Sequence, residues 1–219
     1  MKKFELTSEF ITNIFGTKLF RIKALIEFGN VKAGELGGFV EKEENLSQDG
    51  NAWVYDSARV YGDACVCGDA CVYDNARVCG DARVYGNACV CGNARVCDNA
   101  RVYGNAWVYG NARVHGDARV CGDARVCGDA CVYGDARVCG DACVYGDAGY
   151  ATVHGFGSEY RTTTFFKTKA GDIGVKCGCF YGNLSEFRKK VVETHGETKK
   201  AKEYLMLADL MEFRFSDNS

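Results

Sequence analysis

The sequence predicts a mainly β fold organised around a regularly turning coil, and three observations support this prediction. A six-residue unit, Ala-x-Val-(Tyr/Cys)-(Gly/Asp)-(Asp/Asn), recurs through residues 51–150 without insertion or deletion. The alanine and valine of each unit are separated by one residue, so both side chains point to the same side of a short strand. The Gly or Asp that follows tolerates the left-handed backbone that a tight corner needs, which turns the chain around a narrow interior.

The unit resembles the hexapeptide repeat of the left-handed parallel β-helix family. Residues 60–65, Val-Tyr-Gly-Asp-Ala-Cys, place an aliphatic and a small residue at the family's two inward phases. One departure is that Tyr or Cys fills the phase where the family often has Gly, and Gly usually follows one place later. The resemblance covers about 100 residues. It implies a single-stranded left-handed β-helix shaped as a triangular prism, in which three units form one coil of eighteen residues.

Three parts are expected: an N-terminal β cap in residues 1–50, the β-helix in 51–150, and a small α+β domain in 151–219. Apolar and polar residues alternate in residues 20–28 and predict a strand, with turns at Gly16 and Gly29. Counting back in sixes from Ala52 reaches Leu46 and Val40. We therefore expect the coil to begin before the regular pattern, with larger residues plugging its end.

The last part breaks the repeat after Tyr150, which is expected to close the valine series. Residues 161–167 and 173–179 predict a hairpin, in which Cys177 and Cys179 lie on one side of a strand. Asn183 and Glu186 form a capping-box pattern before a helix that Gly196 ends. A second helix follows, and residues 213–215 are expected to return as a strand.

Composition excludes several classes of function. The net charge is only −2, so nucleic acid or membrane binding requires a local patch. No apolar run is long enough to span a bilayer, and the first residues do not form a signal peptide, so we expect a cytoplasmic protein without membrane contact. Twelve of the 14 cysteines occupy two phases of the repeat, which indicates codon drift between Arg, Cys and Tyr. Zinc-knuckle spacing is missing, and neither a metal nor a cofactor is predicted.

If each coil has eighteen residues, outward residues eighteen apart form ladders on three different faces. Two of the ladders are rich in arginine, and the third contains both tryptophans and is mostly uncharged. The first ladder carries Arg59, Arg77, Arg95 and Arg113, the second carries Arg83, Arg101, Arg119 and Arg137, and the third carries Trp53, Cys71, Cys89, Trp107, Arg125 and Cys143.

Two interpretations of the arginine ladders remain open at this point. Twelve aspartates lie in the repeat, mostly at corners, and are able to neutralise the arginines within the protein. Alternatively, Arg beside Tyr forms a surface that binds phosphates and stacks on bases. The third face, with Trp53 and Trp107, is the better candidate for protein contact.

Many members of the family are acyltransferases that use a catalytic histidine beside acyl-CoA, and a few are zinc carbonic anhydrases. His115 is the candidate general base that the resemblance offers. His154 and His195 lie elsewhere in the sequence, and the coil lacks the loops that often build such sites. The sequence therefore favours a protein that is not an enzyme, with acyl-CoA-dependent transfer by His115 as the alternative.

The whole layout also resembles proteins of phages and prophages of Gram-positive bacteria. Residues 37–47, Gly-Gly-Phe-Val-Glu-Lys-Glu-Glu-Asn-Leu-Ser, and the later Thr-Thr-Thr-Phe-Phe-Lys-Thr and Thr-His-Gly segments carry this likeness. It implies a binding protein whose rigid coil holds a host protein or a nucleotide-bearing partner, in a role against a host defence system. Because the Val and Ala interior is thin, we also expect a homo-oligomer, either a trimer or a dimer.

Overall fold

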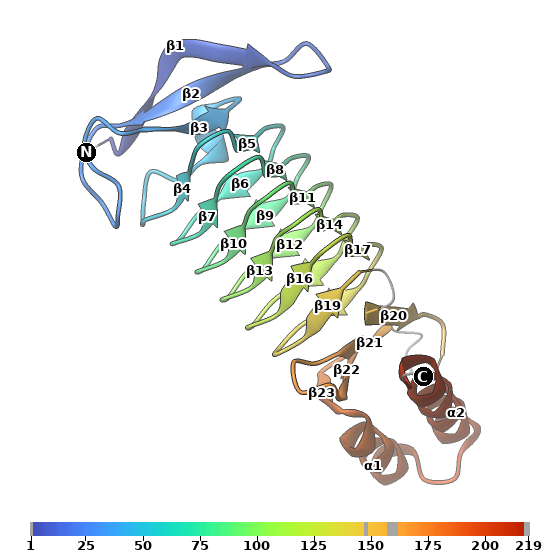
Figure 1. The fold of residues 1–219 in the computed structure, drawn as a ribbon. Coiled ribbons are helices and arrows are strands. Elements are labelled where there is room, and N and C mark those ends of the chain that lie inside the picture. The colour runs from blue at the N-terminus through green and yellow to red at the C-terminus, as the bar shows by residue number, and fades with distance from the viewer. Residues whose placement is uncertain (1, 147–148, 157–161, 217–219) are drawn as a thin grey trace.

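The computed structural model describes residues 2–146, 149–156 and 162–216 and confirms the predicted fold class. A single-stranded parallel β-helix forms a straight rod, one end of which carries an antiparallel β segment (Figure 1). A small sheet and two helices cover the other end. The protein therefore has a long regular middle whose two ends are both covered.

The rod has three faces, each a ladder of very short parallel strands. Face 1 contains β5 (Arg59–Val60), β8 (Arg77–Val78), β11 (Arg95–Val96), β14 (Arg113–Val114) and β17 (Cys131–Val132); face 2 contains β6 (Cys65–Val66), β9 (Arg83–Val84), β12 (Arg101–Val102), β15 (Arg119–Val120) and β18 (Arg137–Val138); face 3 contains β4 (Trp53–Val54), β7 (Cys71–Val72), β10 (Cys89–Val90), β13 (Trp107–Val108), β16 (Arg125–Cys127) and β19 (Cys143–Tyr145).

The register confirms a coil of eighteen residues. Arg95 pairs with Arg77 on one side and with Arg113 on the other, so equal positions in successive units are direct neighbours. The backbone N–H of Arg101 donates to the carbonyl of Ala118 at 2.9 Å, in the next coil. Outward side chains eighteen residues apart therefore stack about 4.8 Å apart, the usual spacing between strands.

The interior consists of the alanine and valine phases. Ala100 and Val102 have no exposed surface, and the same holds to within 1 % for the other described members of both phases. At the corners the glycines adopt φ near +70°, and Asp56, Asp74 and Asp98 take φ values of 49–60° in their place. Asp tolerates this conformation better than most non-glycine residues, which explains why it alternates with Gly at this phase.

The N-terminal cap joins the rod through face 1. It consists of β1 (Phe4–Thr12), β2 (Lys18–Ala24) and β3 (Leu36–Val40), and β3 pairs with β5 in parallel. Val40 lies opposite Val60, and Leu46 lies opposite Val66. Both therefore occupy the valine position, and their predicted place in the alanine phase was wrong.

The reason is an insertion before the first regular unit. Leu46 and Val54 occupy successive valine positions but are eight residues apart, where the repeat has six. Counting in sixes cannot cross these two extra residues. The expectation that larger side chains plug the core is nevertheless confirmed, because Val40 and Leu46 are both fully buried.

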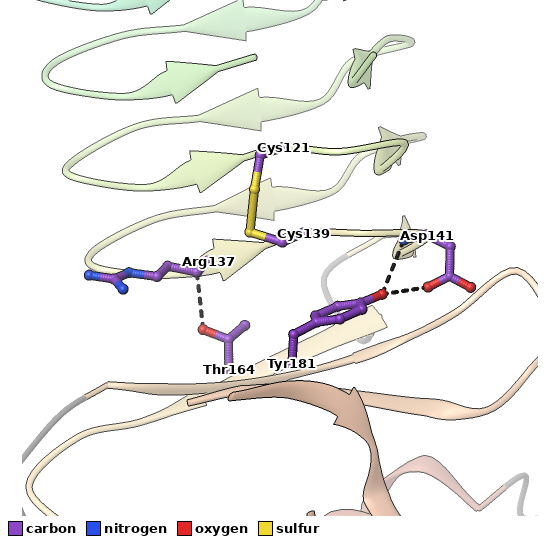
Figure 2. Close-up of a disulfide and its surroundings, with 6 residues drawn as sticks. All are labelled: Cys121, Arg137, Cys139, Asp141, Thr164 and Tyr181. Carbon is purple, nitrogen blue, oxygen red and sulfur yellow. Dashed lines mark hydrogen bonds between the residues drawn. A yellow bond between two sulfur atoms is a disulfide. The ribbon is translucent and has the colours of Figure 1, made fainter. Parts of the chain in front are cut away.

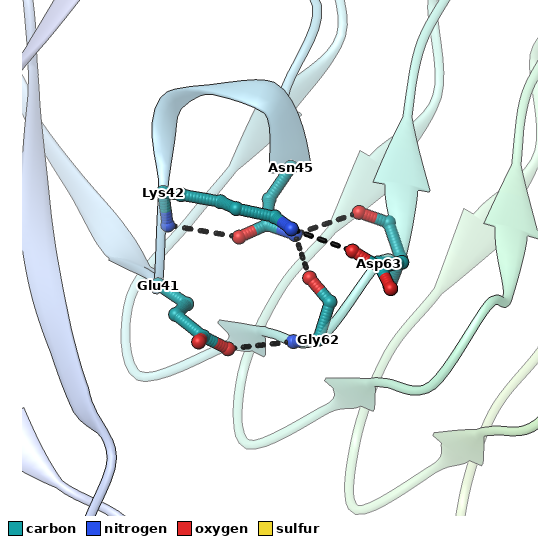
Figure 3. Close-up of polar contacts among 6 residues, drawn as sticks. Glu41, Lys42, Asn45, Gly62 and Asp63 are labelled. Carbon is teal, nitrogen blue, oxygen red and sulfur yellow. Dashed lines mark hydrogen bonds and ion pairs between the residues drawn. The ribbon is translucent and has the colours of Figure 1, made fainter.

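Side chains of the η1 turn (Glu43–Asn45) and of the two residues before it cover the open edge of the first coil (Figure 3). Asn45 Nδ2 donates to the carbonyls of Gly62 and Ala64 at 2.9 and 2.8 Å, and Glu41 accepts from the Gly62 N–H at 2.7 Å. Lys42 Nζ pairs with Asp63 at 2.6 Å. These bonds satisfy backbone groups that an additional coil would otherwise bind, which blocks end-to-end pairing.

The C-terminal part forms a four-stranded antiparallel sheet and a helical hairpin. Its elements are β20 (Tyr150–Val153), β21 (Thr163–Lys167), β22 (Ile173–Cys177), β23 (Phe180–Asn183), α1 (Leu184–His195) and α2 (Lys199–Phe215). Tyr150 does not continue the valine series on a parallel strand as expected. It begins β20, which pairs antiparallel with β21, although its side chain still closes the coil core.

Several predictions in this part are confirmed and two are wrong. The β21–β22 hairpin exists, and Asn183 and Glu186 form the capping box of α1. Residues 213–215 belong to α2, because Met211 and Phe215 continue its buried helical face. Cys177 and Cys179 do not share a strand face, because Gly178, with φ of 55°, lies in the turn between β22 and β23. Among the described helices none is long and apolar enough to cross a membrane.

Candidate ligand-binding face

Face 2 carries a continuous ladder of four arginines. Arg83, Arg101, Arg119 and Arg137 are paired neighbours on β9, β12, β15 and β18, and all four side chains are exposed or half-buried. At about 4.8 Å spacing, each neighbouring pair of positive charges repels by roughly 1 kcal/mol in water. An anion that lies along the ladder would offset this repulsion and be attracted by all four arginines.

Tyrosines run beside these arginines on the same face. Tyr85 and Tyr103 follow the buried valines of β9 and β12, so they point outward next to Arg83 and Arg101. Their rings are stacked with centroids 5.0 Å apart and an angle of 2° between the ring planes. The arginines provide positive charge, and the outer faces of the ring pair are the flat surfaces that remain for stacking.

Face 2 is hollowed at two places along this ladder. One hollow of about 460 Å³ is lined by Arg83, Arg101 and Tyr85 together with Cys65, Cys67 and Asp63. The other, of about 270 Å³, lies between Tyr103, Arg119 and Arg137 and the C-terminal sheet, which contributes Lys176 and Tyr181. Lys176 and Tyr181 carry no signal in the sequence for this position, because only the docking of β22 and β23 under the last coil brings them to this face.

Direct bonds hold the C-terminal sheet against the end of face 2 (Figure 2). The Arg137 backbone N–H donates to Thr164 Oγ1 at 3.0 Å, which replaces the carbonyl that a further coil would supply. Tyr181 donates its hydroxyl proton to Asp141 Oδ1 at 2.7 Å and accepts from the Asp141 N–H at 3.2 Å. Lys176, on β22 of the same sheet, therefore lines one hollow together with Arg119 and Arg137.

Corner aspartates make no described ion pair with the arginines of either ladder. Within the described residues no arginine of either ladder lies within 4.0 Å of a carboxylate oxygen. The corner side chains bond to one another instead, as in the series Asn87, Asn105 and Asp123, whose links are both 3.0 Å long. Other corner carboxylates accept from backbone, as Asp74 does from the Gly92 N–H at 2.9 Å. Within the described residues these arginines are therefore not held in direct ion pairs by the corner aspartates, and neutralisation over longer distances stays a prediction.

Face 1 has the same arginine ladder in a different setting. Arg59, Arg77, Arg95 and Arg113 are paired neighbours as predicted, and they also lack a described carboxylate partner. The phase beside them carries Tyr61, Cys79, Cys97, His115 and Tyr133, so no two tyrosines stack along it. Face 1 is thus basic but offers no stacked tyrosine pair.

Face 3 differs from the prediction at its first level. Trp53 has no exposed surface, because Phe4 and Phe28 of the N-terminal cap cover it, with ring centroids at 6.1 and 5.3 Å. Its predicted role in surface binding was therefore wrong. Trp107 remains 45 % exposed and is a candidate for protein contact.

Cysteines of one phase contact each other between successive coils. Cys121 and Cys139 occupy the same phase in successive coils of face 2 and form a disulfide beside the second hollow (Figure 2). On face 1 the Cys79 and Cys97 sulfurs are 3.0 Å apart, and this contact lowers the pKa of Cys79 to about 7. Drift alone accounts for the residue types, but the coil spacing brings thiols of one phase into bonding range.

The three histidines are not grouped. His115 lies on face 1, His154 contacts Thr162 near the C-terminal sheet, and His195 ends α1 and stacks on Tyr204. Among the described residues no three His, Cys, Asp or Glu side chains converge as a metal site. His115 has its own neighbours, Asp98, Cys131 and Tyr133.

The coil and its outward ladders define a β-solenoid repeat protein. Residues 76–92, 94–110, 106–122 and 124–140 match the family model described as the YdcK beta solenoid repeat. The chain is also similar to a protein of Escherichia coli (strain K12) named "Uncharacterized acetyltransferase YdcK", with 40 % identity over 63 residues. This match covers 26 % of the present chain and 19 % of that relative, and it gives no support to a phage or prophage type.

Proposed function

We propose that this chain is a non-enzymatic binding protein whose face 2 holds a nucleotide-bearing partner, specifically a single-stranded nucleic acid. The observation that carries the proposal is the ladder of four arginines without described carboxylate partners beside the stacked Tyr85 and Tyr103. Lys176 extends the positive charge beyond the last coil. Three ladder steps of about 4.8 Å span roughly 14 Å, so an extended ligand meets all four arginines at once.

The features of face 2 match the requirements of single-strand binding. Such sites combine a positive groove that follows the phosphates with aromatic rings on which bases stack, and they need no readout of base edges. A double helix fits less well, because its paired bases do not expose their faces to the tyrosines. An acidic protein would use the arginines but gain little from the stacked rings.

Fluorescence anisotropy with a labelled single-stranded oligonucleotide tests the proposal. The Arg101→Gln/Arg119→Gln double variant is expected to lose most of its affinity. The matched control is Arg95→Gln/Arg113→Gln, which removes the same charge from the same ladder phase on face 1. Equal losses in the two variants would mean that binding depends on net charge and not on face 2.

The nature of the ligand is tested by the tyrosines. Tyr85→Ser/Tyr103→Ser is expected to weaken oligonucleotide binding, because stacking contributes roughly 1–3 kcal/mol per base. The same variant should bind inorganic polyphosphate as the unaltered protein does, since polyphosphate has no bases. Loss of both ligands, or of neither, would contradict a stacking role.

An acyl-CoA-dependent acyltransferase remains the second candidate, because the Escherichia coli relative is named an acetyltransferase. In this candidate His115 is the general base. A thermal shift with acetyl-CoA, and repeated acyl transfer to a separate acceptor molecule that His115→Ala abolishes, would favour it over the binding function. The role against a host defence system also stays a prediction, which recovery of a host nucleic acid or defence component with the purified protein would test.

A further inference from the structure

Three reactive side chains meet at the C-terminal end of face 1, away from the ligand-binding face. His115 Nε2 lies 3.3 Å from the sulfur of Cys131, and His115 Nδ1 lies 4.0 Å from Asp98 Oδ2. The His115 ring also stacks on Tyr133, with centroids 5.7 Å apart, which fixes its plane. The order is thus a thiol, an imidazole and a carboxylate, as in sites where a base activates a nucleophile.

The coil geometry explains how these residues meet. Cys131 precedes an inward valine and His115 follows one in the previous coil, so they are sixteen residues apart and lie diagonally on the surface. The same diagonal recurs on face 3, where the Cys89 thiol donates to the Tyr73 hydroxyl at 3.2 Å and Tyr55 stands sixteen residues before Cys71. At residue 115 an imidazole, whose ring nitrogens act as proton acceptor and donor, replaces the phenol.

We propose that Cys131 is a nucleophile that takes an acyl group from a small thioester, with His115 as its base and Asp98 as a positioning residue. The Cys131 thiol proton passes to His115 Nε2, and the sulfur forms a bond to the acyl carbon. The bond between that carbon and the donor's sulfur breaks, and the leaving thiolate takes the proton from His115. The products are acyl-Cys131 and a free thiol, so atoms and electrons balance.

A cleft beside Cys131 gives room for the donor. It has a volume of about 510 Å³ and is lined by Tyr133, Tyr150 and Thr152 from the coil end and β20, and by Arg214 of α2. The Tyr150 hydroxyl bonds to the Cys131 carbonyl at 2.8 Å and holds β17 against β20. Arg214 places a positive charge in the cleft, so an electrophile that carries an anionic group is preferred.

Alkylation by iodoacetamide, followed peptide by peptide with mass spectrometry, tests the nucleophile. Cys71 is the matched internal control, because it is half-buried on the same diagonal with Tyr55 in place of His, and burial raises its pKa. Cys131 is expected to react at least about tenfold faster than Cys71 near pH 7, as activated thiols do. Equal rates at the two cysteines would overturn the proposal.

Two variants separate the roles of the neighbours. His115→Tyr gives residue 115 the side chain found at Tyr61 and Tyr133, which the coil accommodates, and should lower the Cys131 rate to that of Cys71. Asp98→Asn retains an acceptor for the Gly116 N–H, now bonded at 3.1 Å, and should give an intermediate rate. An unchanged Cys131 rate in His115→Tyr would show that His115 is not its base.

The acyl step is tested with S-phenyl thioacetate on the whole 219-residue chain. One acetyl group should appear on the peptide that contains Cys131, and Cys131→Ser should remove it. The ratio of the iodoacetate rate to the iodoacetamide rate should be higher at Cys131 than at Cys71, because iodoacetate is anionic. Arg214→Gln should abolish this preference. Acetylation spread evenly over the cysteines would refute the site. None of these measurements involves face 2. A negative result would therefore refute the Cys131 proposal without refuting the proposed oligonucleotide binding.

Discussion

The proposed oligonucleotide binding has a salt dependence that follows from the charges on face 2. Arg83, Arg101, Arg119 and Arg137 lie along it, and Lys176 of the C-terminal sheet lines the hollow at its end, which gives five positive side chains. Each phosphate contact with a single strand contributes about −0.7 to the slope of log K against log salt, which gives about −3.5 for five contacts. Between about 50 and 200 mM salt the affinity should therefore fall roughly 100-fold.

Removing two of these charges should change the slope by a defined amount. Anisotropy titrations of Arg101→Gln/Arg119→Gln at several salt concentrations are expected to give a slope near −2.1, because two contacts of about 0.7 each are lost. Arg95→Gln/Arg113→Gln on face 1 should keep the original slope. A slope that is unchanged in the first variant, or reduced equally in both, would refute phosphate binding along face 2.

Three further predictions concern stability and assembly. Gly104→Ala should destabilise more than Gly134→Ala in chemical denaturation, because both have positive φ but only at Gly104 would a Cβ meet backbone, 3.0 Å from Gly122 N. Burial lowers the pKa of Lys3 to about 8, so the unfolded chain binds this proton more tightly. The free energy of unfolding should therefore rise between pH 8 and 10.5 relative to Lys3→Met, in which this dependence is absent. Trp107→Glu should dissociate a homo-oligomer in sedimentation equilibrium if face 3 forms the contact, whereas an unchanged mass would exclude face 3.

The repeat could be predicted well because each unit encodes its own structure. Alanine and valine at fixed phases determine which side chains are buried, and Gly or Asp at the corner determines where the chain turns. The eighteen-residue register then follows, and with it the ladder to which each arginine belongs. Errors occur where the period breaks, at the insertion between Leu46 and Val54 and at Tyr150.

The candidate site was predicted only in part. The ladder to which a residue belongs follows from its position in the repeat. The burial of Trp53 instead depends on how Phe4 and Phe28 of the N-terminal cap pack on it, which the repeat spacing does not indicate. Lys176 and Tyr181 reach face 2 by docking of a separate sheet, which is equally invisible in the sequence. The contact between His115 and Cys131, by contrast, was implicit in the register, since residues sixteen apart are diagonal neighbours on a face.

Arginine footprinting tests the binding face most directly. The protein is treated with phenylglyoxal, with and without a single-stranded oligonucleotide, and modification is measured at each arginine by mass spectrometry. The ligand should protect the four arginines of face 2 and leave those of face 1 reactive. Protection of Arg59, Arg77, Arg95 and Arg113 instead, or equal protection of both ladders, would contradict the assignment of the ligand to face 2.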